Sequence, residues 1–142
     1  MKGSFLAGII MMLISICFST QASAQKFSKV VTDADRWDPI AIAAPTGCTG
    51  DPQKCALDVL GELKIGVGDE PDFSVYHLGE VEGKDVTVVF VSYLPEDDDS
   101  VLGMLYRLEL SRKEDMSYTL DNAGRMYQCI NGPEGWRKTA CQ

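Results

Sequence analysis

The sequence predicts an α+β fold, with an N-terminal helix packed on a roughly four-stranded antiparallel meander sheet and two disulfides. Apolar residues follow a helical period before residue 66 and a period of two from Phe73 onward. Four cysteines remain after the first 24 residues, an even number that indicates disulfides in an exported chain. Helical segments that precede all of the strand segments favour α+β over an alternating α/β arrangement.

Residues 1–24 have the composition of a cleavable signal peptide. Lys2 gives a positive start, and an apolar stretch of about 14 residues follows over residues 5–18. Spanning a membrane takes roughly 20 apolar residues, so this stretch is short for an anchor. Small residues end the segment, which predicts cleavage between Ala24 and Gln25. We therefore expect a periplasmic or secreted protein with no membrane insertion after cleavage.

The remaining length suits one domain and is too short for two. Residues 25–35 are polar and without periodicity, so we expect a flexible arm there and a single α+β domain over residues 36–142. At the start of that domain, the pair Asp38-Pro39 is a typical helix-start signal. It predicts a short helical turn over residues 40–44.

A longer helix is predicted after the second Asp-Pro pair, Asp51-Pro52. Its apolar residues are spaced by three and four positions and form one stripe, which consists of Ala56, Val59, Leu60 and Leu63. Charged residues lie off this stripe, and a glycine at 66 or 68 ends the helix. The pattern is typical of a helix that buries one face.

Four strands are predicted after the helix, near residues 73–81, 85–94, 101–111 and 117–130. Short connections join them, which favours hairpins and hence a meander. The second strand is apolar on both faces and is predicted to be central. We expect Val88 and Phe90 in the core, with Leu60 and Leu63 above them. The sequence Asn122-Ala-Gly124 interrupts the fourth strand and indicates a bulge or a bend.

The cysteines are predicted to form disulfides and not a metal site. Cys17 is lost with the signal peptide, and the other four allow three connectivities. Proximity in the sequence favours Cys48–Cys55 and Cys129–Cys141. A zinc site is not predicted, because the chain has no Cys-x-x-Cys pair and its one histidine is far from every cysteine.

The chain is acidic, with 13 Lys and Arg against 21 Asp and Glu and a net charge of −8. Loss of Lys2 with the signal peptide makes this −9. Such a charge repels nucleic acid and attracts cationic partners. The strongest charge feature is the acidic run Glu96, Asp97, Asp98 and Asp99. It lacks the spacing and the glycine of a calcium loop, so it fits either a solvated loop or a site for a basic protein.

No motif fixes a catalytic site, and no catalytic residue, metal or cofactor is predicted. His77 is the one histidine, and in an alternating strand it is expected to be a half-buried structural residue. None of the serines lies in a Gly-x-Ser-x-Gly elbow, and no phosphate-binding glycine loop is present.

The C-terminal third resembles the ends of small exported bacterial proteins without an assigned activity. The resemblance covers the run Asp98–Leu110, the run Ala123–Cys129, and then Gly132, Trp136 and Cys141. In those proteins a long strand is followed by a strand that ends in Cys, a glycine turn and a second Cys. The resemblance implies an antiparallel hairpin and supports a Cys129–Cys141 disulfide, and it implies no reaction.

These observations favour a small acidic exported protein, periplasmic or secreted, that binds another protein. An inhibitor or immunity protein against a cationic envelope hydrolase or toxin is the leading interpretation. One alternative is a small-ligand carrier with a cavity between helix and sheet. An envelope hydrolase is a third, which the absence of a catalytic motif disfavours.

Overall fold

The structure is a computed structural model that describes residues 33–43 and 46–142. The predicted signal peptide, its cleavage point between Ala24 and Gln25, and most of the predicted arm lie outside the described residues. The elements, in chain order, are the 3-10 helix η1 (Ala34–Arg36), β1 (Asp38–Pro39), β2 (Gly47–Cys48), the helix α2 (Pro52–Glu62), β3 (Asp72–Val81), β4 (Lys84–Tyr93), β5 (Val101–Arg112) and β6 (Tyr118–Cys129).

The predicted α+β fold class is wrong. The described residues form a mostly-sheet fold, with a six-stranded antiparallel sheet and one short α-helix. The predicted helical turn over residues 40–44 is also wrong, because Asp38 and Pro39 form β1 and pair with Arg125 and Gly124 of β6. Proline is tolerated on such an edge strand, where its missing N–H removes no bond of the ladder. Among residues 33–43 and 46–142, no helix is long and apolar enough to cross a membrane.

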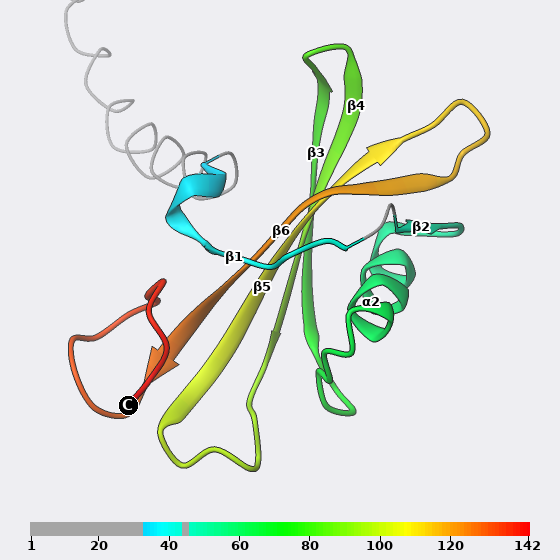
Figure 1. The fold of residues 1–142 in the computed structure, drawn as a ribbon. Coiled ribbons are helices and arrows are strands. Elements are labelled where there is room, and N and C mark those ends of the chain that lie inside the picture. The colour runs from blue at the N-terminus through cyan, green and yellow to red at the C-terminus, as the bar shows by residue number, and fades with distance from the viewer. Residues whose placement is uncertain (1–32, 44–45) are drawn as a thin grey trace, which may run out of the picture.

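The sheet has the strand order β1-β6-β5-β4-β3, and β2 also pairs with β6 (Figure 1). The four long strands begin and end within one residue of the ranges that their period of two predicts. Each pairs antiparallel with the next along the chain, so hairpins join them. Register shifts interrupt the ladder in β3 near Gly79, in β5 at Leu102 and in β6 near Asp121. The shift in β6 lies close to the bulge or bend that Asn122-Ala-Gly124 indicated.

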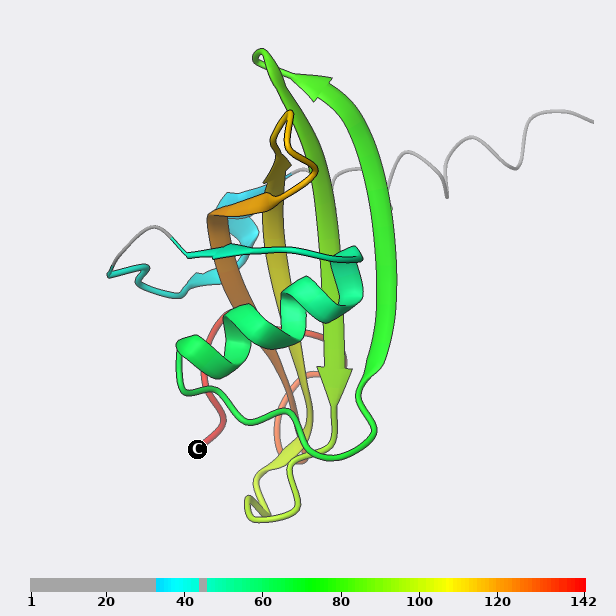
Figure 2. The same cartoon turned by 90° about the vertical axis from the view of Figure 1, so that its right-hand side faces the viewer.

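Helix α2 crosses one face of the sheet (Figure 2). It begins where the sequence predicts, because the carboxylate of Asp51 accepts hydrogen bonds from the N–H groups of Gln53 and Lys54, at 3.0 and 2.9 Å. Pro52 occupies the first turn, where no N–H is needed. The inner face of α2 contributes Cys55, Ala56, Val59 and Leu60 to the main core, and all four are fully buried.

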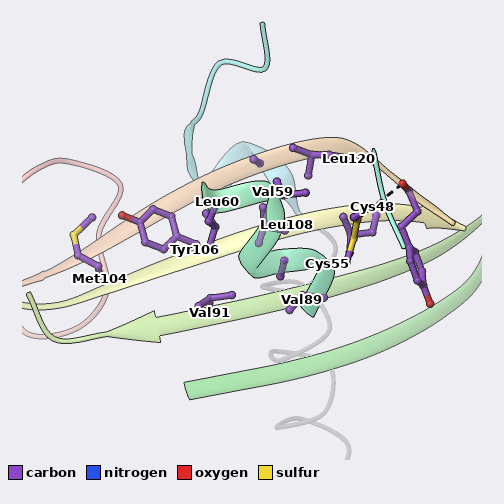
Figure 3. Packing of buried hydrophobic residues seen from close by; sticks show 14 of the residues in the cluster. Cys48, Cys55, Val59, Leu60, Val89, Val91, Met104, Tyr106, Leu108 and Leu120 are labelled. Carbon is purple, nitrogen blue, oxygen red and sulfur yellow. Dashed lines mark hydrogen bonds between the residues drawn. A yellow bond between two sulfur atoms is a disulfide. The ribbon is translucent and has the colours of Figure 1, made fainter. Parts of the chain in front are cut away.

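The main core lies between α2 and one face of the long strands (Figure 3). Val59 and Leu60 belong to the same buried cluster as Val89, Val91 and Leu108, and all five are fully inaccessible to solvent. Because successive residues of a strand point to opposite faces, Val89 and Val91 face the helix while Val88 and Phe90 face away from it.

The opposite face of the sheet carries a second, smaller core. Its buried members are Trp37, Val86, Val88, Phe90 and Met126. The rings of Trp37 and Phe90 stack with centroids 5.5 Å apart. The expectation that Leu60 and Leu63 lie above Val88 and Phe90 is therefore wrong. The cause is that β4 is apolar on both faces, so its sequence cannot show which face meets the helix.

The two edges of the sheet differ. The outer edge of β6 is covered by three separate segments. The N–H of Ile40 donates to the carbonyl of Ala123 at 2.9 Å, and the N–H of Leu120 donates to the carbonyl of Thr46 at 2.9 Å. Near the end of β6, Tyr127 and Arg137 exchange two backbone hydrogen bonds of 2.8 Å. On the other edge, no segment within the described ranges pairs with the outer side of β3.

Candidate functional site

The four cysteines form the predicted pairs. Cys48 and Cys55 have Cα atoms 5.3 Å apart, and Cys129 and Cys141 have Cα atoms 5.5 Å apart. The first disulfide fastens the first turn of α2 to β2. The second closes the C-terminal segment into a loop on the end of β6. The predicted connectivity is thus confirmed.

Two loops meet at the end of the sheet where β4 and β6 finish and β5 begins (Figure 1). One is the β4–β5 loop, residues 94–100, and the other is the C-terminal loop, residues 130–142. The N–H of Ile130 donates to the carbonyl of Ser100 at 3.0 Å and joins them directly. We call the surface formed by residues 94–102 and 130–142 the sheet-end surface.

The predicted acidic run lies on this surface, and its members have different roles. The carboxylate of Asp98 accepts hydrogen bonds from the N–H of Ser100 at 2.9 Å and from its hydroxyl at 2.6 Å. The hydroxyl and the N–H of Ser100 hold the pKa of Asp98 below its usual value. Asp98 therefore shapes the turn. Glu96, Asp97 and Asp99 are exposed to solvent on the same loop.

The described residues contain no cluster of histidine, cysteine and carboxylate side chains that could hold a metal ion. The four acids of the run are adjacent in the sequence, and one of them is engaged in the turn. The run thus presents a negative field to solvent in place of a ligand cage.

Exposed apolar side chains lie at the strand ends next to the acidic loop. Leu94 is 74% exposed, and it follows Tyr93, which pairs with Met104. Leu102 and Ile130 are about half exposed, and they adjoin the pair Val101–Cys129. Apolar side chains of this size are usually covered in a monomer when they gather in one place.

Trp136 is the largest side chain of the sheet-end surface, and it is 43% exposed. Its ring lies over Gly103 of β5, where an added Cβ would come within 3.1 Å of Cη2. The loop around it is held by the Cys129–Cys141 disulfide and by a hydrogen bond from the Arg137 guanidinium to the carbonyl of Pro133, at 2.8 Å. An open depression of about 790 Å³ is lined by this loop. One indole face is therefore fixed in place and accessible.

Sequence reasoning missed the apolar part of this surface. It found the acidic run from its charge, and it placed Trp136 only in the resemblance to exported proteins. A tryptophan in a loop rich in glycine and proline, between two bonded cysteines, is the signal that could have identified it, because such a loop cannot bury a large ring on its own.

His77 lies on β3, away from the sheet-end surface. Its Nδ1 is 3.0 Å from the hydroxyl oxygen of Thr87 on β4. The side chain is exposed, whereas the sequence predicted a half-buried one. The register shift after His77 places this position at a bulge of an edge strand, which explains the exposure.

Other polar groups of the sheet are engaged in structural contacts. The hydroxyl of Ser111 donates to the carboxylate of Asp121, which also pairs with Lys84 at 3.0 Å. The buried guanidinium of Arg107 pairs with Glu109 at 2.6 Å. The Ser111 group lies beside the register shift of β6 and ties the strands together there. Neither the Ser111–Asp121–Lys84 cluster nor the Arg107–Glu109 pair includes the histidine that a serine nucleophile uses as its base.

Comparison of the chain with protein-family models, with curated proteins and with solved structures gives no match. The resemblance of residues 98–141 to small exported bacterial proteins stays a prediction. Function is therefore inferred from the sheet-end surface itself.

Proposed function

We propose that this protein is a small acidic exported binding protein that recognises a basic protein through its sheet-end surface. The observation that carries the proposal is that three exposed carboxylates and four exposed apolar side chains lie on two joined loops and the adjoining start of β5. The apolar side chains are Leu94, Leu102, Ile130 and Trp136.

The apolar residues supply what a protein interface needs at its centre. Interface energy is concentrated in a few side chains, and tryptophan is enriched among them. The ring of Trp136 is held by the disulfide-closed loop, so little conformational entropy is lost when a partner covers it. A rigid aromatic anchor with charged residues around it is typical of a protein-binding surface.

The carboxylates indicate the sign of the partner's charge. The chain has a net charge of −8, and Glu96, Asp97 and Asp99 add a local negative field beside the anchors. Opposite charge accelerates encounter and sets specificity more than it adds affinity. A cationic hydrolase or toxin of the cell envelope is a partner of this chemistry, and the protein would then be its inhibitor or immunity protein.

Export is part of the proposal. Two disulfides are consistent with an oxidising compartment, since cytosolic thiols are kept reduced. The composition of residues 1–24 supports a signal peptide that would deliver the chain there.

The packing of the helix favours protein binding over the ligand-carrier alternative. A carrier would hold its ligand between α2 and the sheet. In the structure that space is filled by fully buried side chains, which include Val59, Leu60, Val89 and Leu108 (Figure 3). One open hollow of the described residues lies instead at the C-terminal loop.

The experiment uses two variants of the sheet-end surface and a panel of purified basic envelope hydrolases and toxins, with acidic proteins of similar size as controls. The first variant combines Glu96→Gln, Asp97→Asn and Asp99→Asn and keeps Asp98, which holds the turn. We expect at least one basic protein to bind, and the charge variant to associate several-fold more slowly at low salt with an unchanged melting temperature.

The second variant, Trp136→Ala, is expected to increase the dissociation rate by about tenfold or more, as loss of a central anchor does. Its matched control is Leu57→Ala, which removes an apolar side chain of 38% exposure from the outer face of α2. Binding that is indifferent to both sheet-end variants, or equal binding of acidic and basic proteins, contradicts the proposal.

A further inference from the structure

We propose that the outer edge of β3 is a second binding site, which takes an extended basic segment of a partner as an added strand. The site goes beyond the proposed function, because it includes no residue of the sheet-end surface. It can be tested whether or not that surface binds a protein.

The contrast between the two edges is the first observation. The edge of β6 is satisfied by three separate segments, through backbone hydrogen bonds at Leu120, Ala123 and Tyr127. The edge of β3 has no such cover among residues 33–43 and 46–142. Unpaired N–H and C=O groups along an edge are a template for another strand, so proteins normally protect them.

The geometry of β3 is the second observation. Between Asp72 and His77 the strand pairs with β4 residue for residue, from Asp72–Ser92 to His77–Thr87. This stretch is regular enough to accept a further strand. The register shift before Gly79, where φ is +74°, bends the strand and ends the regular stretch. An added strand would therefore pair with residues 72–77.

The side chains of this stretch would contact an added strand on both faces. Phe73 and Val75 are partly buried and pack against the main core. Tyr76 packs against the second core on the other face and meets Phe90 edge-on, with centroids 5.6 Å apart. A partner strand with apolar residues opposite these positions would extend both cores, since cross-strand pairs stabilise a sheet.

The charge along the edge identifies the occupant. Five exposed acids lie on β3 or beside its two ends, namely Asp69, Glu70, Asp72, Glu80 and Glu82. None of the ion pairs in the described part of the chain involves them. A second copy of this chain would bring two acidic edges together, and like charges on facing strands repel. A segment with lysine or arginine would instead be attracted, which is why we assign the edge to a basic partner.

The test uses the whole protein and a synthetic peptide of the same length as β3, in which lysine alternates with valine. Binding is measured by calorimetry, and the site is located by backbone hydrogen exchange. We expect the peptide to protect amides of residues 72–77. Alternate N-methylation of the peptide keeps its charge and removes its strand hydrogen bonds, and it should weaken binding by about tenfold or more.

Variants of the protein separate this site from the sheet-end surface. The pair Asp72→Asn and Glu80→Gln should weaken peptide binding several-fold at low salt, while the sheet-end charge variant should bind the peptide as the wild type does. A peptide with glutamate in place of lysine should not bind. These outcomes support the strand-addition site even if no partner is found for the sheet-end surface.

Three outcomes would overturn the inference. The first is binding that alternate N-methylation leaves unchanged, which would show a purely ionic contact. The second is protection located outside β3, or no binding of the lysine peptide. The third is protection of residues 72–77 that rises with the concentration of the protein alone, which would assign the edge to a second copy.

Discussion

Gly124 has no side chain at the point where Trp37 crosses β6. An added Cβ would lie 2.5 Å from the Cβ of Trp37 and 3.4 Å from the carbonyl oxygen of Asp38. Trp37 is 98% buried by this close approach and stacks on Phe90. One absent methyl group thus allows the segment before β1 to close the second core.

Substitution of Gly124 is therefore expected to destabilise the fold. Gly124→Ala should lower the free energy of unfolding by roughly 1–3 kcal/mol, because the indole of Trp37 and the backbone of β1 must both move away from the added methyl group. The matched control is Gly61→Ala in α2, where an added Cβ meets nothing within 4 Å. That change should raise stability by roughly 0.5–1 kcal/mol through helix propensity and chain entropy.

Urea denaturation of the two variants checks this prediction, and Trp37 emission recorded in a Trp136→Phe background reports the second core. Equal stabilities of the two variants would show that β6 and the segment with Trp37 adapt to each other. The tight contact would then contribute nothing to the free energy of unfolding.

At the scale of elements, the C-terminal loop depends on one disulfide. The bond spans 12 positions and closes the segment that carries Trp136. Beyond the disulfide, the loop is fixed by the backbone bonds between Tyr127 and Arg137 and by a hydrogen bond from Lys138 to the carbonyl of Asp35, at 3.1 Å. The sheet itself has its own cores, so the loop and the sheet should differ in stability.

Replacement of both Cys129 and Cys141 by serine should loosen the loop and leave the sheet folded. The loss of stability is expected to be roughly 2–3 kcal/mol, from the closure entropy of a loop of this size. The emission of Trp136 should shift to longer wavelength while that of buried Trp37 stays unchanged. Spectra recorded in the Trp136→Phe background separate the two signals. A lost sheet signal in far-ultraviolet dichroism would contradict the prediction.

The elements differ in how far their sequence predicts them. Helix α2 and the four long strands have local signals, namely a capped apolar stripe and a sustained period of two. Strands β1 and β2 have only two residues each, which is too short for any period. Their pairing depends on β6, and the ion pair between Asp38 and Arg125 links positions 87 apart in the sequence. Asp38-Pro39 is a helix-start signal in the sequence, but pairing with β6 makes this segment a strand.

For the molecule as a whole, the sheet separates two cores. Val59 lies in the core under α2, and Val88 lies in the core under Trp37. Both side chains are fully buried. Residues that share no neighbour usually contribute to stability independently.

The double variant Val59→Ala and Val88→Ala tests this separation. Each change should cost roughly 2 kcal/mol, from two lost methyl groups and the cavity that they leave. The two costs should add within about 0.5 kcal/mol in a denaturant-based cycle. A coupling above about 1 kcal/mol would mean that the central strand transmits strain between the faces, and that the molecule has a single core.

The candidate site shows the same division between local and long-range information. The charge of residues 96–99 is visible in the sequence, and so are the cysteines that close the C-terminal loop. The exposure of Leu94, Leu102 and Ile130 is not visible in the sequence. Leu94 and Ile130 adjoin strands and Leu102 belongs to β5, and the apolar patterns of these strands suggest burial. Only the pairing of the strand ends brings these side chains to one surface.

The covered edge of β6 also limits how copies of this molecule can assemble. Open-ended growth of a fibre needs two free edges on every subunit, so that each addition presents a new one. Within the described residues this sheet offers one such edge, on β3. A second copy that pairs there uses the free edge of both molecules and ends the series. The three segments that cover β6 thereby restrict association through sheet edges to a single step, and they protect the protein against runaway polymerisation.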